Sequence, residues 1–231
     1  MQPDVHHGLL GRDQGFAIVV AMMGLLMISA MAVALVLATT TDALIARNFS
    51  DGATAMYAAE TIALRTIDDL AAEPDWSAVL DGRAHATFFD GGAGQRALAD
   101  GSTIDLTAIV NVWNCGKGPA CTTADMNRTT VERPWGGNNP QWRIYACGRL
   151  ADLAPGVRST SREYVLLLVA DDPSETDGDS SVDGDGAANP GSGVILLRGE
   201  AFGAGGSHAV VDVTVARAGP RLRVVSWRLG R

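Results

Sequence analysis

The sequence predicts an α+β protein in which a long N-terminal helix packs on a C-terminal antiparallel β-sheet. Three observations lead to this fold class. An uninterrupted apolar run follows Gly15, and an amphipathic, helix-like segment without proline continues that run through residues 39–72. From residue 73 to residue 231, short stretches of alternating or β-branched residues are separated by glycine-rich turns, which is typical of strands in one head domain.

The composition limits the classes of function. The chain has 231 residues and a formal net charge of −8. Without its apolar run it retains about 190 residues, which suits one folded domain. No basic stripe interrupts the acidic background, so we expect no nucleic acid among the direct partners. The 27 glycines and few aromatic residues favour strands and long loops over a compact helical enzyme.

The apolar run from Phe16 to Ala38 contains no charged residue and only Gly24 and Ser29 as mild interruptions. At about 1.5 Å per residue, a helix of this length spans roughly 35 Å, enough to cross a hydrocarbon core of about 30 Å. The run is longer than the apolar part of a simple secretory signal. It therefore predicts a transmembrane helix over 16–38. A competing interpretation takes "AVA" at residues 32–34 as a signal cleavage site that releases everything downstream.

The amphipathic segment 39–72 predicts that the same helix continues beyond the membrane, to a length of roughly 85 Å, until Pro74 ends it. Apolar side chains recur along it at steps of three, four or seven, so we expect this stripe to bury against the head domain. The stripe consists of Ile45, Phe49, Ala53, Met56, Ala63, Ile67 and Leu70. Glu60 lies at its edge, where it either contacts the head or a neighbouring subunit or reaches past the stripe to solvent.

The stretch "RDQG" followed by Phe16, together with this helix, resembles the N-terminus of type IV pilins. The resemblance implies that residues 1–15 form a prepilin leader, that a prepilin peptidase cleaves after Gly15, and that Phe16 becomes a methylated N-terminus. It also implies that the apolar helix leaves the inner membrane for the filament core. The residues implied in that core are Phe16, Val20, Gly24, Leu25 and Leu35.

"GFAIVVAMMGLLMISAMAVAL" and "IARNFSDGATAMYAAETIAL" are more closely similar to PilX-type minor pilins, although Arg47 stands where that family tends to have glycine. "NNPQWRI", the Gly-rich hairpin "LLRGEAFGAGGSHAVVDVTVAR" and "VSWR" near the C-terminus also fit the PilX-type pattern. Major pilins carry a glutamate where this chain has Val20. This departure disfavours a major subunit, and it fits both PilX-type proteins and the tip pseudopilin of type II secretion.

The resemblance implies a structural role, namely a minor pilin involved in type IV pilus assembly. Its implied partners are other minor pilins, the major pilin, the pilus assembly platform and the prepilin peptidase. The implied location is the bacterial inner membrane, crossed once with the head in the periplasm, and later the pilus (fimbrium) at the cell surface. Two alternatives stay open: a minor pseudopilin of type II secretion, and a signal-anchored extracytoplasmic binding domain.

The head domain is predicted to be rich in strands. The stretch 163–170 is apolar on both faces, so we expect a central strand covered by the long helix. Residues 193–202 and 208–217 flank "GAGGS", a hairpin signal in which glycines supply the positive φ angles of the turn. Further strands are expected at 83–90, 103–113, 141–148 and 221–230.

Three cysteines would face an oxidising compartment after export. If 104–113 and 141–148 pair as antiparallel neighbours, Cys147 lies opposite about residue 108, several residues from Cys115. We therefore expect a disulfide between Cys115 and Cys121, which flank the short loop "GKGPA", and a buried thiol at Cys147. All three pairings remain possible on sequence alone, and the spacing matches no usual zinc site.

Residues 171–193 carry many acidic side chains and no basic one: Asp171, Asp172, Glu175, Asp177, Asp179, Asp183 and Asp185. We expect a solvated, extended loop between two strands and no cofactor. The alternative is calcium binding by the hard oxygen ligands of Asp177, Asp179, Asp183 and Asp185. An EF-hand pattern fails, because Ser181 and Ala188 hold its fifth and twelfth positions counted from Asp177.

No catalytic motif is found. The histidines are His6 and His7 in the leader, His85 in an expected strand and His208 beside the hairpin turn. "STSRE" at 159–163 has hydroxyl groups without a nucleophile-elbow context. Since no nucleophile, base and oxyanion donor assemble, we expect a protein that is not an enzyme.

Overall fold

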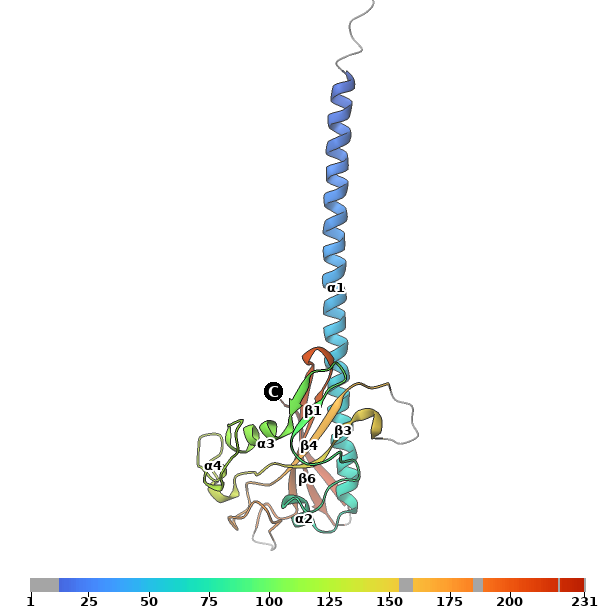
Figure 1. Cartoon of the computed structure of the whole chain (residues 1–231). Helices are drawn as coiled ribbons and strands as arrows, with labels where there is room; N and C mark the ends of the chain where they lie inside the picture. The colour runs from blue at the N-terminus through green and yellow to red at the C-terminus, as the bar shows by residue number, and fades with distance from the viewer. Residues whose placement is uncertain (1–12, 154–159, 185–188, 220, 231) are drawn as a thin grey trace, which may run out of the picture. The chain divides into compact units, whose positions relative to one another are not determined.

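The computed structural model describes residues 13–153, 160–184, 189–219 and 221–230. The chain divides into two compact units, of which the first ends at Phe49 and the second runs from Ser50 to the C-terminus. Helix α1 (Asp13–Ala72) supplies all of the described first unit and enters the second with residues 50–72 (Figure 1). The helix is continuous through residue 40, which confirms the predicted extension beyond the apolar run.

The second unit combines short helices with strands. Helices α2 and α3 span Trp76–Leu80 and Leu106–Cys115, and α4 spans Thr123–Met126. Strands β1 (Gln95–Ala97) and β2 (Thr103–Asp105) form a small antiparallel pair. The main strands are β3 (Arg143–Arg149), β4 (Tyr164–Asp171), β5 (Val194–Phe202), β6 (His208–Ala218) and β7 (Arg221–Leu229). Single 3-10 turns lie at Gly136–Asn138, Leu150–Asp152 and Ala204–Gly206.

The main sheet of the described residues is antiparallel, with the strand order β3-β4-β5-β6-β7. Each strand pairs with the next one along the chain, so the connections are simple reversals. The predicted strands at 141–148, 163–170 and 221–230 and the predicted hairpin are confirmed. The long N-terminal apolar helix and the C-terminal antiparallel sheet form an α+β, pilin-like arrangement, as the sequence predicted.

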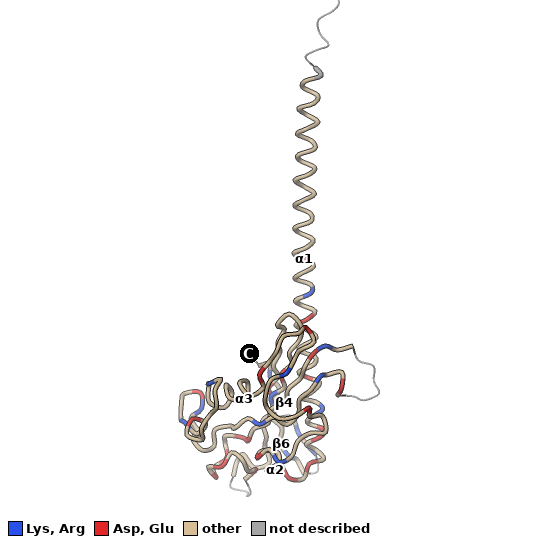
Figure 2. The backbone as a smooth tube through the Cα atoms, viewed as in Figure 1, with Lys and Arg blue, Asp and Glu red and all other residues tan. Residues whose placement is uncertain are grey.

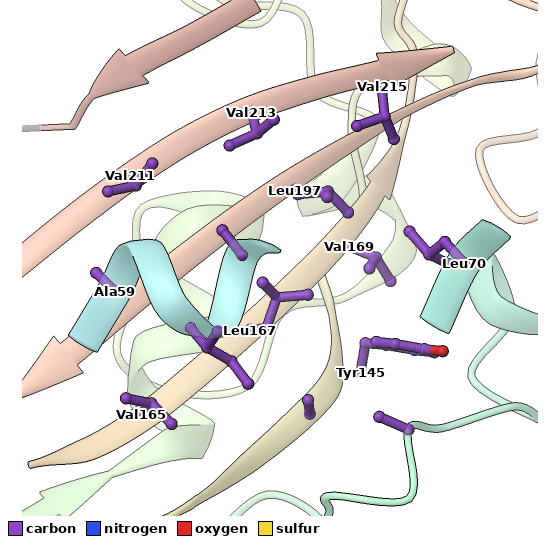
Figure 3. Packing of buried hydrophobic residues seen from close by; sticks show 14 of the residues in the cluster. Ala59, Leu70, Tyr145, Val165, Leu167, Val169, Leu197, Val211, Val213 and Val215 are labelled. Atoms are coloured by element: carbon purple, nitrogen blue, oxygen red, sulfur yellow. The ribbon is translucent and has the colours of Figure 1, made fainter. Parts of the chain in front are cut away.

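Strand β4 is buried along its entire length because both of its faces are covered. Val165, Leu167 and Val169 contribute to the core beneath residues 55–70 of α1. The alternate residues Leu166 and Leu168 belong to a second cluster with Leu106 of α3, on the opposite face. Figure 3 shows the first cluster, in which side chains from α1 and from several strands meet. Residues 55–70 of α1 thus cover one face of β4, and α3 covers the other face.

The buried face of α1 in the second unit is made largely of small residues. Its buried members are Ala55, Ala58, Ala59, Ile62, Ala63, Thr66 and Leu70. Opposite them, β5 carries Gly199, and a Cβ atom at that position would lie 2.7 Å from the carbonyl oxygen of Ala59 and 3.4 Å from Cγ2 of Ile62. The alanines and Gly199 therefore let the helix backbone approach the sheet backbone closely.

The predicted stripe needs correction at one end. Ile45 and Phe49 belong to the first unit and are 62% and 79% exposed, and the buried face within the second unit begins at Ala55. Leu70 is buried, whereas Met56 and Ile67 are half-buried and pack against the main core. Glu60 is half-buried at the edge of the face. The buried face therefore shares Ala63 and Leu70 with the predicted stripe, whereas Ala55 and Thr66 are buried in place of the predicted neighbours Met56 and Ile67.

The strand predicted at 103–113 is wrong beyond its first residues. The Asp105 carboxylate accepts hydrogen bonds from the N–H groups of Thr107 (2.9 Å) and Ala108 (3.2 Å), so it caps α3. Gly116 ends that helix with a left-handed φ of 72°. The expected pairing of 104–113 with 141–148 is therefore also wrong.

The strand predicted at 83–90 is replaced by an irregular segment along β3. It makes one isolated parallel bridge, between Phe89 and Cys147. The Ala86 N–H donates to the carbonyl of Tyr145 at 3.0 Å, and the Asp90 N–H donates to that of Cys147 at 3.1 Å. These bonds satisfy part of the outer edge of β3 without forming a regular ladder.

The predicted cysteine pairing is confirmed, although not by the reasoning that led to it. Cys115 at the end of α3 forms a disulfide with Cys121. Cys147 is a buried free thiol in β3. The short loop between the first two cysteines brings them together because α3 ends at Gly116 and the chain turns back.

Candidate functional site: the apolar N-terminal helix

The first unit presents apolar side chains on all sides of its helix. From Phe16 to Ala38 no charged residue interrupts it, and Figure 2 shows this length of α1 without acidic or basic positions. The side chains of Phe16, Val20, Leu25 and Leu35 are all more than half exposed. An apolar surface this continuous is not stable in water and requires lipid or other apolar helices around it.

Among the described residues, α1 is the helix that is long and apolar enough to cross a membrane, over Gly15–Ala72, and its most apolar window is not buried within the protein. Length and composition of this kind are shared by membrane anchors and by N-terminal signal sequences.

The polar residues that follow the apolar run are satisfied within the helix. The hydroxyl of Thr39 donates to the carbonyl of Leu35 at 3.0 Å, and that of Thr41 donates to the carbonyl of Leu37 at 2.9 Å. Thr40 makes an equivalent bond one residue along. Because these hydroxyls need no external partner, the segment compatible with an apolar environment extends to Thr41, just before Asp42. The sequence interpretation, which ended the run at Ala38, missed this extension.

The predicted processing position lies at the start of the described helix. Gly15 and Phe16 are both helical and exposed, while the rest of the predicted leader up to residue 12 lies outside the described residues. Gly24 is half-buried, and a Cβ atom built there meets nothing within 4 Å. Together with Val20, these residues lie on one exposed helix.

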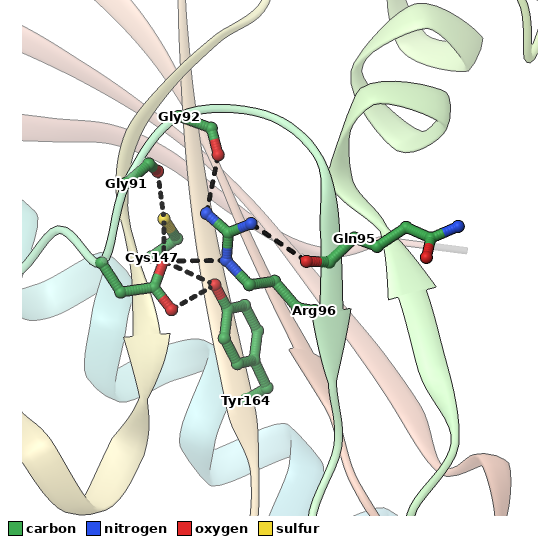
Figure 4. A network of polar contacts seen from close by, with 7 residues as sticks. Gly91, Gly92, Gln95, Arg96, Cys147 and Tyr164 are labelled. Atoms are coloured by element: carbon green, nitrogen blue, oxygen red, sulfur yellow. Dashed lines mark hydrogen bonds and ion pairs between the residues drawn. The ribbon is translucent and has the colours of Figure 1, made fainter.

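The head contains a polar network in which the exposed carboxylate of Asp90 meets the buried side chains of Cys147 and Tyr164 (Figure 4). The Tyr164 hydroxyl lies 2.9 Å from both carboxylate oxygens, and the Cys147 thiol donates to Oδ1 at 3.2 Å. Arg96 pairs with the same carboxylate at 3.1 Å and donates to the Gly92 carbonyl at 2.7 Å. The network fastens the 90–96 segment to β3 and β4.

The thiol in that network is not a nucleophile at neutral pH. Burial raises the pKa of Cys147 to about 11, and the neighbouring Asp90 carboxylate acts in the same direction. A thiol with such a pKa stays protonated and inert. Burial likewise raises the pKa of Tyr164. The arrangement is therefore that of a structural hydrogen-bond network.

Two described histidines make aromatic and polar contacts rather than catalytic pairs. His85 stacks on Phe89 with ring centroids 4.3 Å apart. His208 stacks on Phe202 and lies 2.9 Å from the buried carboxylate of Glu200. Within the described ranges, neither ring has a hydroxyl or thiol as hydrogen-bond partner. His6 and His7 lie outside those ranges.

A second cluster that the sequence interpretation missed joins α3 to the sheet. Arg198 of β5 forms a two-bond ion pair with Asp212 of β6, at 2.6 and 2.8 Å. Its guanidinium lies 3.6 Å from the ring centroid of Trp113, whose indole N–H donates to Glu200 at 2.7 Å. The alternation of "LLRGEAF" gave a signal, since Arg198 and Glu200 share one strand face at spacing two.

A cavity of about 500 Å³ lies between the 81–93 segment, α3 and β3. Its lining includes His85, Asn111, Asn114 and Trp142. Asn114 is already used inside the fold, since it donates to the carbonyl of Trp142 at 3.0 Å and accepts from its N–H at 2.6 Å. These internal bonds occupy the side-chain amide of Asn114.

The acidic segment between β4 and β5 is only partly solvated, which corrects the expectation of an extended loop. Glu175 and Ser180 are buried, and the Asp183 N–H donates to the Ser77 hydroxyl at 3.1 Å. Of the four predicted calcium ligands, Asp179 bonds to Ser181 and Asp183 accepts from the Gly193 N–H at 2.7 Å.

The other two predicted calcium ligands are Asp177, which accepts from the Asp179 N–H at 3.0 Å, and Asp185, which lies outside the described residues. In the described part of the chain, no three His, Cys, Asp or Glu side chains already surround one point as metal ligands. The predicted quartet is therefore not brought together there.

Comparison with known proteins gives one family match. The family described as PilX N-terminal matches residues 14–61, which includes the apolar run and the first buried turns of α1 in the second unit. No curated protein and no solved structure matches the chain. Residues 14–61 are therefore similar to a PilX-type pilin N-terminus, and an antiparallel sheet follows them in a pilin-like α+β arrangement.

Proposed function

We propose that this protein is a minor pilin, a structural subunit that takes part in type IV pilus assembly through its N-terminal helix. One observation carries the proposal: an exposed, charge-free stretch of α1 from Gly15 to Thr41 lies within the PilX N-terminal match, and the same helix continues into a segment packed on a sheet. An anchor alone needs no such continuation. A filament subunit does, because a single helix must connect the filament core to the head.

The precursor rests in the inner membrane through residues 16–38, with its head in the periplasm. Prepilin peptidase removes residues 1–15, and Phe16 becomes the methylated N-terminus. The helix then exchanges lipid contacts for contacts with neighbouring helices. Since both surroundings are apolar, the exchange depends on close packing rather than on removal of surface from water. The small Gly24 and the internally bonded hydroxyls of Thr39–Thr41 suit both surroundings.

Val20 supports a minor rather than a major subunit. A carboxylate at this depth in lipid is stable only when it is paired, and in major pilins its partner is the N-terminal amine of a neighbour. Val20 cannot form that pair, so this chain does not select its neighbours in that way. The proposed partners are other minor pilins, the major pilin and the assembly platform, chosen through the head surface.

A specific pair of variants tests incorporation. Gly15→Val is expected to block leader removal and to keep the protein in the inner membrane fraction, absent from sheared filaments. Gly24→Val places the same side chain at another uncrowded glycine of α1 and is expected to leave leader removal intact. Equal cleavage of both variants, or filament incorporation of the uncleaved chain, contradicts the proposal.

A minor pseudopilin of type II secretion is the second candidate, because Val20 fits that class equally well. The two functions differ in partner. Crosslinking in the native cell is expected to recover pilus subunits for the first and secretion pseudopilins for the second.

A further inference from the structure

Strand β7 forms one edge of the main sheet, and its outer side has no hydrogen-bonding partner among the described residues. The other edge strand, β3, is different, because Ala86 and Asp90 donate hydrogen bonds to its carbonyl groups. Strand β7 is nine residues long and contains neither lysine nor proline. A long uncovered edge is a template for a further strand, and proteins usually cover it or interrupt it with such residues.

The backbone of β7 is oriented for such pairing. The Gly230 N–H donates to the Val210 carbonyl at 2.8 Å, so residue 230 directs its backbone toward β6. This direction alternates along an antiparallel strand, and the register with β6 is regular over 226–229. The N–H and C=O groups of Trp227 and Leu229 therefore point outward, away from β6.

The face of β7 on the α1 side of the sheet is apolar and only partly covered. Trp227 lies opposite the buried Val213 of β6 and is half-buried against the main core. Leu229 lies opposite the buried Val211 but is 64% exposed. Val224, on the same face, is 45% exposed. An added strand would cover these side chains and extend the core by one strand.

The opposite face of β7 carries positive charge. Arg221, Arg223 and Arg228 are exposed and form no ion pair within the described part of the chain. Asp212 lies opposite Arg228, but it already accepts two hydrogen bonds from Arg198. Strand β7 contains no acidic residue, although the whole chain has a net charge of −8. Acidic side chains of a partner strand would lie directly opposite these arginines.

We propose that β7 is an interaction surface that accepts an extended strand of a partner protein in which apolar and acidic side chains alternate. The apolar side chains of that strand pack beside Trp227 and Leu229, and the acidic ones pair with the arginines on the other face. A second copy of β7 is a poorer occupant, because aligning the apolar faces of two copies also brings their arginines together. The surface lies in the head and does not depend on the pilin assignment.

The test uses the full chain in non-ionic detergent micelles and a probe peptide as long as β7, in which valine and glutamate alternate. We expect saturable binding by calorimetry and slower hydrogen exchange at the amides of Trp227 and Leu229. Two control peptides are expected to bind more weakly by on the order of tenfold, because each lacks one set of cross-strand contacts. In the first, serine replaces valine at unchanged charge, and in the second the backbone amides are methylated.

A charge reversal on β7 tests the role of the arginines. Arg223→Glu is expected to weaken binding of the valine–glutamate peptide by on the order of tenfold and to strengthen binding of a valine–lysine peptide. The matched control is Arg149→Glu, which makes the same charge change at an exposed position of β3, the other edge strand. This control is expected to keep the wild-type affinity.

Absence of saturable binding of the valine–glutamate peptide overturns the proposal, as does exchange protection confined to segments other than β7. Equal binding of the serine–glutamate peptide also overturns it, since the arginines would then attract any polyanion. Circular dichroism verifies the fold of each variant. If Arg223→Glu does not fold, Arg228→Glu decides in its place, and retention of wild-type affinity by the folded variant overturns the proposal.

Discussion

Gly199 of β5 is the position where the helix–sheet contact can be perturbed most cleanly. In Gly199→Ala the new Cβ atom would lie 2.7 Å from the Ala59 carbonyl oxygen, well inside ordinary contact, and 3.5 Å from Cβ of Ala63. The obstacle is a backbone atom of α1, which cannot rotate away. The helix must therefore move off the sheet, and the alanine-rich face beneath it loses close contact.

The expected decrease in the free energy of unfolding follows from the loss of packing. Overpacking a filled core typically costs about 1–3 kcal/mol, and Gly199→Val should lie at or above the upper end. For a domain of this size, such a loss lowers the thermal midpoint by about 3–10 °C. The gain of about 0.5–1 kcal/mol that alanine gives over glycine in the unfolded chain offsets only part of it.

The assay is thermal unfolding of the full chain in detergent micelles, followed by near-ultraviolet circular dichroism of the tryptophans. Gly52→Ala is the matched control, since the same Cβ atom there meets nothing within 4 Å on an exposed turn of α1. We expect this control to be neutral or slightly stabilising. A midpoint for Gly199→Ala at or above that of the control would refute the close helix–sheet approach.

Three further predictions follow. Arg198→Met is expected to lower the free energy of unfolding by roughly 2 kcal/mol, because it leaves Asp212 without its two charge-assisted hydrogen bonds. The control Arg223→Met, on the exposed edge strand β7, should change the free energy of unfolding measured by urea titration by no more than about 0.5 kcal/mol. The pKa of Asp171, raised to about 8 by burial, means that its stabilising contribution is present at low pH and is lost as the pH rises from about 4 to about 8. The stability of Asp171→Asn minus that of the wild type should therefore grow across this range, and a flat difference contradicts the burial of this acid. Cys147, with its raised pKa of about 11, should resist alkylation at pH 7 until the chain is denatured, and labelling of the native protein would be incompatible with its burial.

The elements that the sequence predicted correctly are those in which one periodic pattern dominates. The apolar run and the 3.6-residue stripe leave no alternative to a helix through residue 72. The stretch that became β4 is β-branched or leucine-rich on both faces and too short for a buried helix. Gly205 and Gly206 identify the hairpin because they permit the turn conformation, with φ of 68° at Gly205.

The failures have physical reasons of two kinds. In 103–113 the apolar residues fit both period two, which is typical of a strand, and period 3.6, which is typical of a helix. The capping residues Asp105 and Gly116 are the sequence features that indicate helix α3. Ile45 and Phe49 continue the apolar pattern, but periodicity cannot say whether the head or a neighbouring helix covers them.

The buried acids could not be predicted in any detail. Asp171 and Glu175 look like ordinary members of an acidic loop in sequence, and only the three-dimensional return of the chain buries them. The disulfide was predicted correctly because its loop is short, even though the strand pairing used to exclude Cys147 does not exist.

We propose that processing makes Phe16, near the start of α1, the N-terminal residue of a filament subunit. Intact-mass and N-terminal peptide analysis of the protein from its native cell tests this most directly. We expect a chain that starts at Phe16 with one added methyl group on its amine. A chain that starts at Met1 or near Leu35 would contradict it.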